Sequence, residues 1–214
     1  MNMELLEVLA CPICKMGHLR HEQSSKIETL TCTKCSRAYK VLDGIPNMLP
    51  DEIGNDLSSK DTGWDVWNAK LKNFILWREK TWDRSTSADK LQSQAVNLKE
   101  RFIDFIGIKN SSTRIIDIGC GGGDIKAMLG TCSYYGVDPL LIEGRQYDFP
   151  IVRGVGEYLP FPDGFFDEAM LNQVLDHCNS IDGVLEETVR VVGAKGTINV
   201  MQYLSVPDSL PTRM

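Results

Sequence analysis

The sequence predicts an α/β protein whose parallel sheet ends after its fifth strand, preceded by a small module that a metal stabilises. Strand-like and helix-like segments alternate after residue 113, which is typical of a parallel sheet covered on both faces. Two Cys-x-x-Cys pairs fall within the first 50 of 214 residues. Only 11 residues follow Tyr203, too few for the further strands of a larger sheet.

Four segments follow from changes in composition and periodicity. Residues 1–50 form the cysteine-bearing N-terminal module, and the polar, Gly- and Ser-containing residues 51–63 form a linker. Residues 64–110 carry apolar positions at helical spacing, which predicts helices from Trp64 to about Trp82 and from Ala88 to about Ile106. Residues 111–214 form the α/β domain.

The α/β domain is expected to contain five strands and two helices. The strands are predicted at Arg114–Ile118, Tyr134–Val137, Ile151–Arg153, Glu168–Leu171 and Thr197–Tyr203. A helix is predicted to begin over Asp124–Leu129, and another spans Ile181–Val192.

The four cysteines of the N-terminal module have the spacing of a structural zinc site. Cys11 and Cys14 form one Cys-x-x-Cys pair, Cys32 and Cys35 form the other, and 17 residues separate the pairs. Two such knuckles supply four thiolates at tetrahedral geometry, which leaves no open position for catalysis. Fifty residues bury little core, so Zn²⁺ would supply folding free energy. The alternative is a reduced, metal-free knuckle.

The N-terminal module resembles a known family. The resemblance rests on the string from Leu5 to Cys14, the string from Leu30 to Cys35, and the segment from Tyr39 to Pro50. These resemble the small zinc-ribbon activator subunit of tRNA, rRNA and release-factor methyltransferases and its bacterial relatives. The resemblance implies a module that docks beside a methyltransferase, here fused to it in one chain.

A glycine-rich turn follows the first predicted strand. Asp117, Gly119, Cys120, Gly121 and Gly123 lie in the string IIDIGCGGG, and glycines allow a sharp turn and close approach of a ligand. A dinucleotide fingerprint would need glycine where Asp124 stands, and carboxylates would repel a pyrophosphate. The order Asp-x-Gly-x-Gly-x-Gly resembles motif I of class I S-adenosylmethionine-dependent methyltransferases, which implies a Rossmann-like domain with these residues at the cofactor.

Two further segments complete the predicted cofactor site. Asp138, 21 residues after Asp117, ends the second strand beside Pro139, where a carboxylate can accept both ribose hydroxyls. The segment from Gly154 to Asp167 resembles one in ubiquinone/menaquinone-type methyltransferases. That resemblance implies adenine contacts from backbone groups of Gly156 and Glu157, although Val155 replaces the family's aspartate.

The segment after the fourth strand is expected to face the transferred methyl group. By the same resemblance, Asn172 and Gln173 line the cofactor. Methyl transfer needs positioning and exclusion of water, and a base only where the acceptor must lose a proton. His177 is the candidate base, with Asp176 behind it; the alternative is that both are ordinary polar helix residues.

Composition limits the possible partners and location. Net charge is −6, and residues 111–214 hold 7 Lys/Arg against 14 Asp/Glu, which disfavours a nucleic-acid partner. No apolar run is long enough to span a bilayer, and the first residues lack the pattern of a signal peptide, so a cytoplasmic location is expected. Cysteines in a reducing compartment favour metal binding over disulfides.

The sequence therefore predicts an S-adenosylmethionine-dependent methyltransferase acting on a small-molecule acceptor, such as a sugar or metabolite. Alternatives are an RNA or protein methyltransferase, a cofactor-binding but inactive scaffold, and a zinc-ribbon nucleic-acid binder, which leaves the Asp-Gly motif unexplained. The fifth strand would be a sheet edge, and exposed edges invite pairing. We expect the N-terminal module, the C-terminal tail or a second subunit, as in a homodimer, to cover it.

Overall fold

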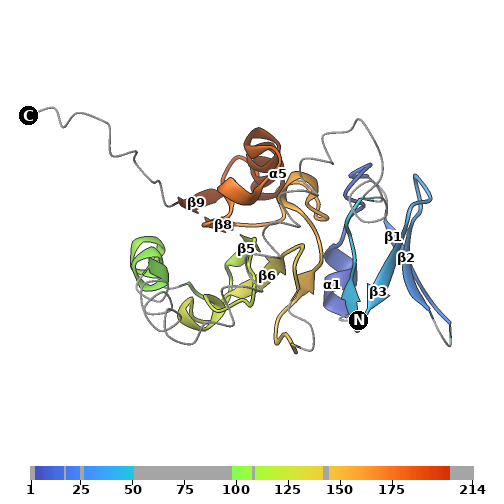
Figure 1. Cartoon of the computed structure of the whole chain (residues 1–214), viewed down its shortest axis with the longest axis horizontal. Helices are drawn as coiled ribbons and strands as arrows, with labels where there is room; N and C mark the ends of the chain where they lie inside the picture. The colour runs from blue at the N-terminus through green and yellow to red at the C-terminus, as the bar shows by residue number, and fades with distance from the viewer. Residues whose placement is uncertain are drawn as a thin grey trace, which may run out of the picture.

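The computed structural model describes residues 3–16, 18–24, 27–50, 98–107, 109–141 and 145–202 (Figure 1). These residues form an antiparallel four-stranded sheet and a parallel five-stranded sheet. The predicted linker 51–63 and the predicted helix from Trp64 to Trp82 lie outside the described residues. Of the second predicted helix, residues 98–106 are described, and they are helical.

The N-terminal module consists of one helix and one sheet. Helix α1 (Met3–Val8) precedes β1 (Leu19–Gln23), β2 (Glu28–Cys32), β3 (Ala38–Leu42) and β4 (Ile45–Pro46), which pair in chain order. Asp43 and Gly44 connect β3 to β4 with φ of 51° and 78°. Positive φ at both central residues is the backbone of a tight hairpin turn, for which Asp-Gly is a preferred pair.

The α/β domain is a parallel sheet with the strand order β7-β6-β5-β8-β9. Its strands are β5 (Arg114–Ile118), β6 (Ser133–Val137), β7 (Ile151–Val152), β8 (Glu168–Asn172) and β9 (Thr197–Met201). The chain order reverses between β5 and β8, and in open parallel sheets ligands bind at the carboxyl ends of the strands beside such a switch point. The predicted Rossmann-like fold is confirmed, and every predicted strand is found within about two residues.

One face of this sheet has its predicted helix, and the other has less helix than expected. Helix α5 (Ile181–Val192) begins where the Ser180 side chain accepts from the Gly183 backbone N–H and ends at Gly193, which has φ of 72°. The helix predicted from Asp124 is reduced to a single 3₁₀ turn, η1 (Lys126–Met128). The reason is local: only six residues separate Gly123 and Gly130, and both glycines adopt positive φ.

The larger hydrophobic core is shared by the two parts of the chain. It joins Leu5, Leu30 and Met48 of the N-terminal module to Ile116 and Phe161 of the α/β domain. A second, smaller core lies on the opposite face of the sheet, where the helix at 98–106 contributes Phe102 and Ile103. Because burial of apolar surface is the main favourable term in folding, the shared core makes the module part of the domain's own packing.

The N-terminal module lies along β7, at the opposite end of the sheet from β9 (Figure 1). Arg153, expected to continue the third strand, instead forms a parallel bridge with Asn47. The Arg153 N–H donates to the Pro46 carbonyl at 2.9 Å, and the Met48 N–H donates to the Arg153 carbonyl at 2.7 Å. The expectation that this module covers the β9 edge is therefore wrong, because its backbone at residues 46–48 hydrogen-bonds to Arg153, directly after β7.

The fifth strand ends sooner than predicted, at Met201 instead of Tyr203. Within the described chain, no strand pairs with the outer side of β9. The C-terminal tail and a second subunit remain the predicted covers of this edge.

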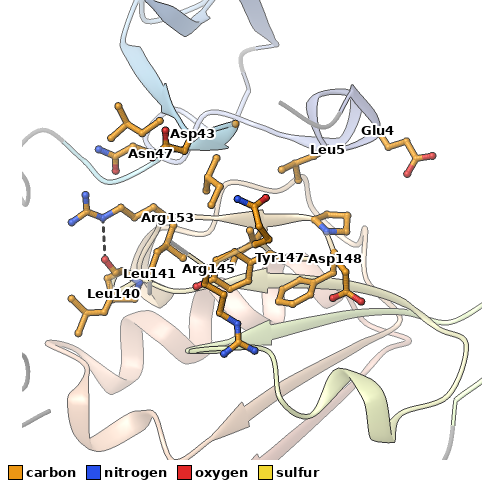
Figure 2. A pocket seen from close by; sticks show the side chains of 18 residues that line it. Glu4, Leu5, Asp43, Asn47, Leu140, Leu141, Arg145, Tyr147, Asp148 and Arg153 are labelled. Carbon is orange, nitrogen blue, oxygen red and sulfur yellow. Dashed lines mark hydrogen bonds between the residues drawn. The ribbon is translucent and has the colours of Figure 1, made fainter. Parts of the chain in front are cut away.

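A cleft of about 870 Å³ lies between the N-terminal module and the segment that connects β6 to β7 (Figure 2). Leu5 and Asn47 line it from the module, and Leu140, Tyr147 and Arg153 line it from the domain. None of the helices in the described part of the chain has the length and apolar character to cross a membrane.

Candidate cofactor and metal sites

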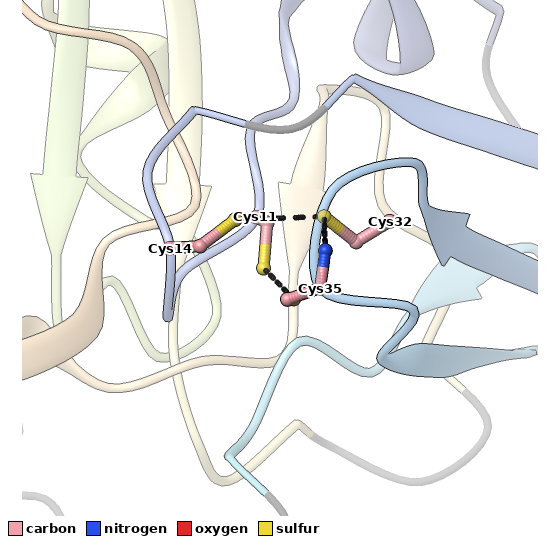
Figure 3. Close-up of side chains that lie close together, drawn as sticks. All are labelled: Cys11, Cys14, Cys32 and Cys35. Atoms are coloured by element: carbon pink, nitrogen blue, oxygen red, sulfur yellow. Dashed lines mark hydrogen bonds between the residues drawn. The ribbon is translucent and has the colours of Figure 1, made fainter.

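The four predicted zinc ligands meet at one point (Figure 3). Their sulfur atoms all lie within 4.8 Å of one another, with 3.6 Å between Cys11 and Cys35 and 3.5 Å between Cys14 and Cys32. Four sulfurs at about 2.3 Å from a tetrahedral Zn²⁺ would be about 3.8 Å apart. The cluster therefore has the size that zinc requires, with all four positions taken by thiols.

The two knuckles share one backbone conformation. Each turn ends on a residue with positive φ directly after its second cysteine: Lys15 at 59° and Ser36 at 58°. The second knuckle also aims its Lys34 and Cys35 backbone N–H groups at the Cys32 sulfur, at 3.4 and 3.5 Å. Donors of this kind favour the thiolate, the form that binds metal.

The first knuckle also ties the N-terminal module to α5. Lys15 pairs with Glu187, which accepts from the Leu159 N–H at 2.9 Å and from Arg190 at 2.8 Å. Burial raises the pKa of the Glu187 carboxyl, but hydrogen bonds from Arg190 and Lys15 outweigh it and hold that pKa below its usual value. The Ala10 N–H donates to the Pro160 carbonyl at 2.9 Å beside this network.

The glycine turn folds around the carboxylate of Asp138. The Gly121 N–H donates to Asp138 Oδ2 at 2.8 Å, and the Leu140 N–H donates to Oδ1 at 2.7 Å. Gly119 has φ of 75°, and a Cβ there would lie 2.4 Å from the Val174 side chain. The turn thus requires glycine, and Asp138 holds it against the end of β6. Since a carboxylate offers about four acceptor sites, Asp138 can still accept from ribose hydroxyls.

Gly123 and Cys120 complete the turn by packing. A Cβ on Gly123, which has φ of 71°, would lie 2.3 Å from the ring of Phe149. The Cys120 thiol lies against Gly136. Burial raises the pKa of Cys120 well above its usual value, so this thiol stays protonated.

Asp117 is a buried carboxyl below the turn, only 3% exposed, and it accepts a hydrogen bond from the Tyr134 hydroxyl. Burial raises the pKa of Asp117 to about 7; the Tyr134 hydrogen bond opposes this, and the charge of Asp138 adds to it. Asp124, by contrast, pairs with Lys99 at 2.8 Å, which lowers its pKa.

The predicted adenine-side residues are held in the core. Gly156 lies so close to the Val184 side chain that a Cβ would be 3.0 Å away. The Glu157 carboxylate accepts from the Asn179 and Ser180 backbone N–H groups, at 2.8 and 3.2 Å, ahead of α5. Val155, the departure from the family pattern, is 2% exposed. The side chain of Glu157 thus fixes the segment, and the predicted adenine contacts fall to its backbone.

The end of β8 carries an unsatisfied polar atom. Asn172 Oδ1 is buried and has no hydrogen-bond partner in the described chain. The next residue, Gln173, has φ of 56°, an uncommon conformation for a residue other than glycine. Such strain is frequent at ligand sites. A ligand that donates a hydrogen bond here would satisfy Asn172.

Asp176 and His177 lie in the 3₁₀ turn η3 (Leu175–His177), just beyond Asn172. His177 Nε2 lies 3.8 Å from Asp176 Oδ2, and both side chains are exposed. Gln202, at the end of β9, fixes the turn by donating to Asp176 Oδ1 at 3.0 Å and accepting from the Leu175 N–H at 3.1 Å. Sequence reasoning missed Gln202, because nothing in a lone glutamine after a strand indicates its partner.

The structure therefore brings the predicted residues into two separate centres. The four cysteines form one thiol cluster, and the glycine turn, Asp138 and the end of β8 lie at the carboxyl ends of neighbouring strands.

Comparison with known proteins identifies both parts of the chain. Residues 116–200 match the family described as Methyltransferase domain, so the α/β part is a methyltransferase domain. Residues 3–44 match Trm112p-like protein, and the chain belongs to this family through its N-terminal module. The predicted fusion of a module that is similar to Trm112p-like proteins, with four clustered cysteines, to an S-adenosylmethionine-dependent methyltransferase domain is confirmed.

Individual relatives match one part or the other. A UPF0434 protein of Methylobacillus flagellatus is 48% identical over 52 residues, which cover 24% of this chain and 82% of that protein. The 27-O-demethylrifamycin SV methyltransferase of Amycolatopsis mediterranei is 26% identical over 177 residues, covering 74% of this chain and 61% of that enzyme. The chain thus spans less than two thirds of this methyltransferase.

Among solved structures, the complex between the Haloferax volcanii Trm112 methyltransferase activator and a methyltransferase is 18% identical, with a TM-score of 0.43. The match covers 66% of this chain and 60% of that one.

Proposed function

We propose that this chain transfers the methyl group of S-adenosylmethionine to a small-molecule acceptor, with a structural Zn²⁺ in its N-terminal module. The observation that carries the proposal is the arrangement at the carboxyl ends of β5, β6 and β8, where Asp138 organises the glycine turn and Asn172 leaves a buried oxygen unsatisfied. Oxygen atoms that accept hydrogen bonds, together with a negatively charged carboxylate, suit a nucleoside that carries hydroxyl, ammonium and sulfonium groups.

Each of these residues has a role in holding and orienting the cofactor. The Asp138 carboxylate accepts from the ribose hydroxyls while its bonds to Gly121 and Leu140 keep the turn in place. Asp117 accepts from the Tyr134 hydroxyl beneath the turn, and Asn172 Oδ1 accepts from a donor at the end of β8. The bound cofactor supplies an electrophilic methyl group on a sulfonium. The chain's task is then to align an acceptor in line with it and exclude water.

His177 is the candidate proton acceptor for acceptors that must ionise. Gln202, at the end of β9, holds Asp176 in place, and Asp176 Oδ2 lies 3.8 Å from His177 Nε2. This role matters only for hydroxyl or amine acceptors that lose a proton.

A small-molecule acceptor fits the charge of the domain and one relative. The excess of seven acidic residues in residues 111–214 (14 against 7) opposes a polyanion such as RNA. The Amycolatopsis mediterranei relative is named for a small-molecule acceptor, 27-O-demethylrifamycin SV.

Calorimetry on the zinc-loaded chain tests cofactor binding. S-adenosylmethionine and S-adenosylhomocysteine should each bind at one site, and NAD should not bind. Asp138→Asn should weaken S-adenosylhomocysteine at least tenfold, because a charge-assisted acceptor is lost. Asp148→Asn, an exposed aspartate in the same β6–β7 connection, is the matched control and should leave affinity unchanged.

The acceptor class is tested by S-adenosylhomocysteine release across a panel of sugars, hydroxylated metabolites, RNA and peptides. Cofactor binding without release on any acceptor would indicate an inactive scaffold. Absence of S-adenosylhomocysteine binding would refute the proposal, as would retention of NAD.

A further inference from the structure

The cleft between the N-terminal module and the β6–β7 connection has one end, at Asn47 and Arg153, that lies on a different strand from the proposed reacting groups. It follows β7, whereas the proposed reacting groups lie at the end of β8. The order β7-β6-β5-β8 places three strand spacings between them, about 14 Å at the usual separation of neighbouring strands. The Asn47–Arg153 end of the cleft therefore lies about three strands away from the end of β8.

Two polar groups lie together at one end of the cleft. Asn47 and Arg153 are partners in the parallel bridge that joins the two parts of the chain, so their side chains share one face (Figure 2). Asn47 Oδ1 is buried without a hydrogen-bond partner in the described residues. Burying an acceptor without a hydrogen bond is costly, so this oxygen favours a ligand that donates to it.

Arg153 presents an anchored cation to the same place. Its Nε donates to the Pro139 carbonyl at 3.0 Å, which fixes the guanidinium plane. No carboxylate among the described residues lies within ion-pair distance of it. Arg145, the other arginine of the cleft, is paired with Asp124 at 3.4 Å. The acidic side chains of the lining are exposed, and of these Asp148 is paired with Lys126.

The rest of the lining is suited to an apolar body. Leu5 and Ile45 face the cleft from the module, and Leu140 and the Tyr147 ring face it from the domain. A volume of about 870 Å³ lies within the range of about 300–1,000 Å³ typical of small-molecule sites, and such sites combine apolar walls with a few convergent polar groups.

We propose that this cleft is a second ligand site, which binds a small amphipathic carboxylic acid whose carboxylate pairs with Arg153 and whose neighbouring donor reaches Asn47 Oδ1. The donor must lie next to the carboxylate, because the two side chains are bridge partners. The class is therefore an α-hydroxy acid or an N-acylamino acid with an apolar side chain. A carboxylate on an arginine is the strong, geometrically specific form of such a bond.

The site is tested by calorimetry on the full zinc-loaded chain with 3-phenyllactate as the probe. Two related probes separate its groups: 3-phenylpropanoate lacks the hydroxyl donor, and 3-phenylpropane-1,2-diol lacks the carboxylate. Phenyllactate should bind at one site per chain, and each of the other two should bind at least about fivefold more weakly. The measurement needs no methyl donor, so its outcome is independent of the proposed enzyme activity.

Variants assign the binding to the two side chains. Arg153→Gln should reduce phenyllactate affinity at least about tenfold, whereas Arg145→Gln, a matched change in the same cleft, should not. Asn47→Leu should abolish the preference for phenyllactate over phenylpropanoate. Unchanged circular dichroism and zinc content identify variants that fold correctly.

The proposal would be overturned if phenyllactate did not bind at concentrations on the order of 10 millimolar, or if Arg153→Gln bound it as tightly as the wild type does. It would also be overturned if light scattering showed a dimer that Arg153→Gln dissociates. The last result would mean that a second copy of the chain occupies the cleft.

Discussion

The buried carboxyl of Asp117 should make the fold lose stability as pH rises toward neutrality. Its pKa is about 7 in the folded chain, against an ordinary value of 3.8, because burial disfavours the charged form. The folded state therefore binds more protons than the unfolded state between these two pH values, and stability falls as pH rises through this window. The full effect, 1.36 kcal/mol for each of about 3 pKa units, is about 4 kcal/mol.

The substitution Asp117→Asn isolates this effect. The amide cannot ionise, and its oxygen can still accept from the Tyr134 hydroxyl. At pH 5.5 the wild type has already lost the stability that corresponds to about 1.7 of the 3.2 pKa units between the folded and unfolded values. The remaining loss, up to pH 8, corresponds to about 1.5 pKa units. The free energy of unfolding of Asp117→Asn minus that of the wild type should therefore rise by about 2 kcal/mol between pH 5.5 and pH 8. Urea denaturation without cofactor, at saturating zinc, measures it at each pH.

Asp104→Asn is the control, since Asp104 is an exposed helical aspartate and its substitution should give a difference independent of pH. A stability difference for Asp117→Asn that stays constant from pH 5.5 to 8 would refute the reasoning. The reasoning would also be refuted if Asp117→Asn became progressively less stable than the wild type as pH rises.

Three other perturbations have defined outcomes. Cys32→Ser should lower zinc from about one per chain, measured by atomic absorption, and should unfold the N-terminal module; unchanged metal content and melting would disprove the zinc assignment. Glu187→Gln should cost about 1–3 kcal/mol in urea denaturation, because buried donors of Leu159 and Arg190 lose a charged acceptor; an effect within error would show that the network contributes little. His177→Ala should reduce turnover by about 10²-fold or more on an acceptor that must ionise while leaving S-adenosylhomocysteine affinity unchanged; equal losses in both would indicate a structural role.

The sheet and α5 could be predicted because their signals are local. Arg114–Ile118 is a short apolar run, and α5 begins after a Ser180 N-cap and ends at Gly193, so its bounds follow from the adjoining residues. The cysteine cluster followed from spacing alone, since two Cys-x-x-Cys turns have few other ways to bring four thiols together.

The docking of the N-terminal module could not be predicted, because it depends on contacts distant in sequence. Lys15 and Glu187 are 172 residues apart, and neither belongs to a recognisable pattern. The same limit applies to Glu157: the motif indicated the segment, but only the fold shows that its carboxylate accepts from Asn179 and Ser180. The shortened η1 turn was missed because Asp124–Leu129 has helical composition, while the flanking glycines set its length.

The N-terminal module and the methyltransferase domain are joined by the bridge between Asn47 and Arg153 and by a shared hydrophobic core, and they belong to one chain. This linkage determines how the two parts behave in a dilute cell extract. Two separate subunits would dissociate as concentration falls, whereas tethered partners face each other at an effective concentration on the order of millimolar. The activator-like module and the methyltransferase domain are therefore always present in equal amounts, and dilution should not separate them.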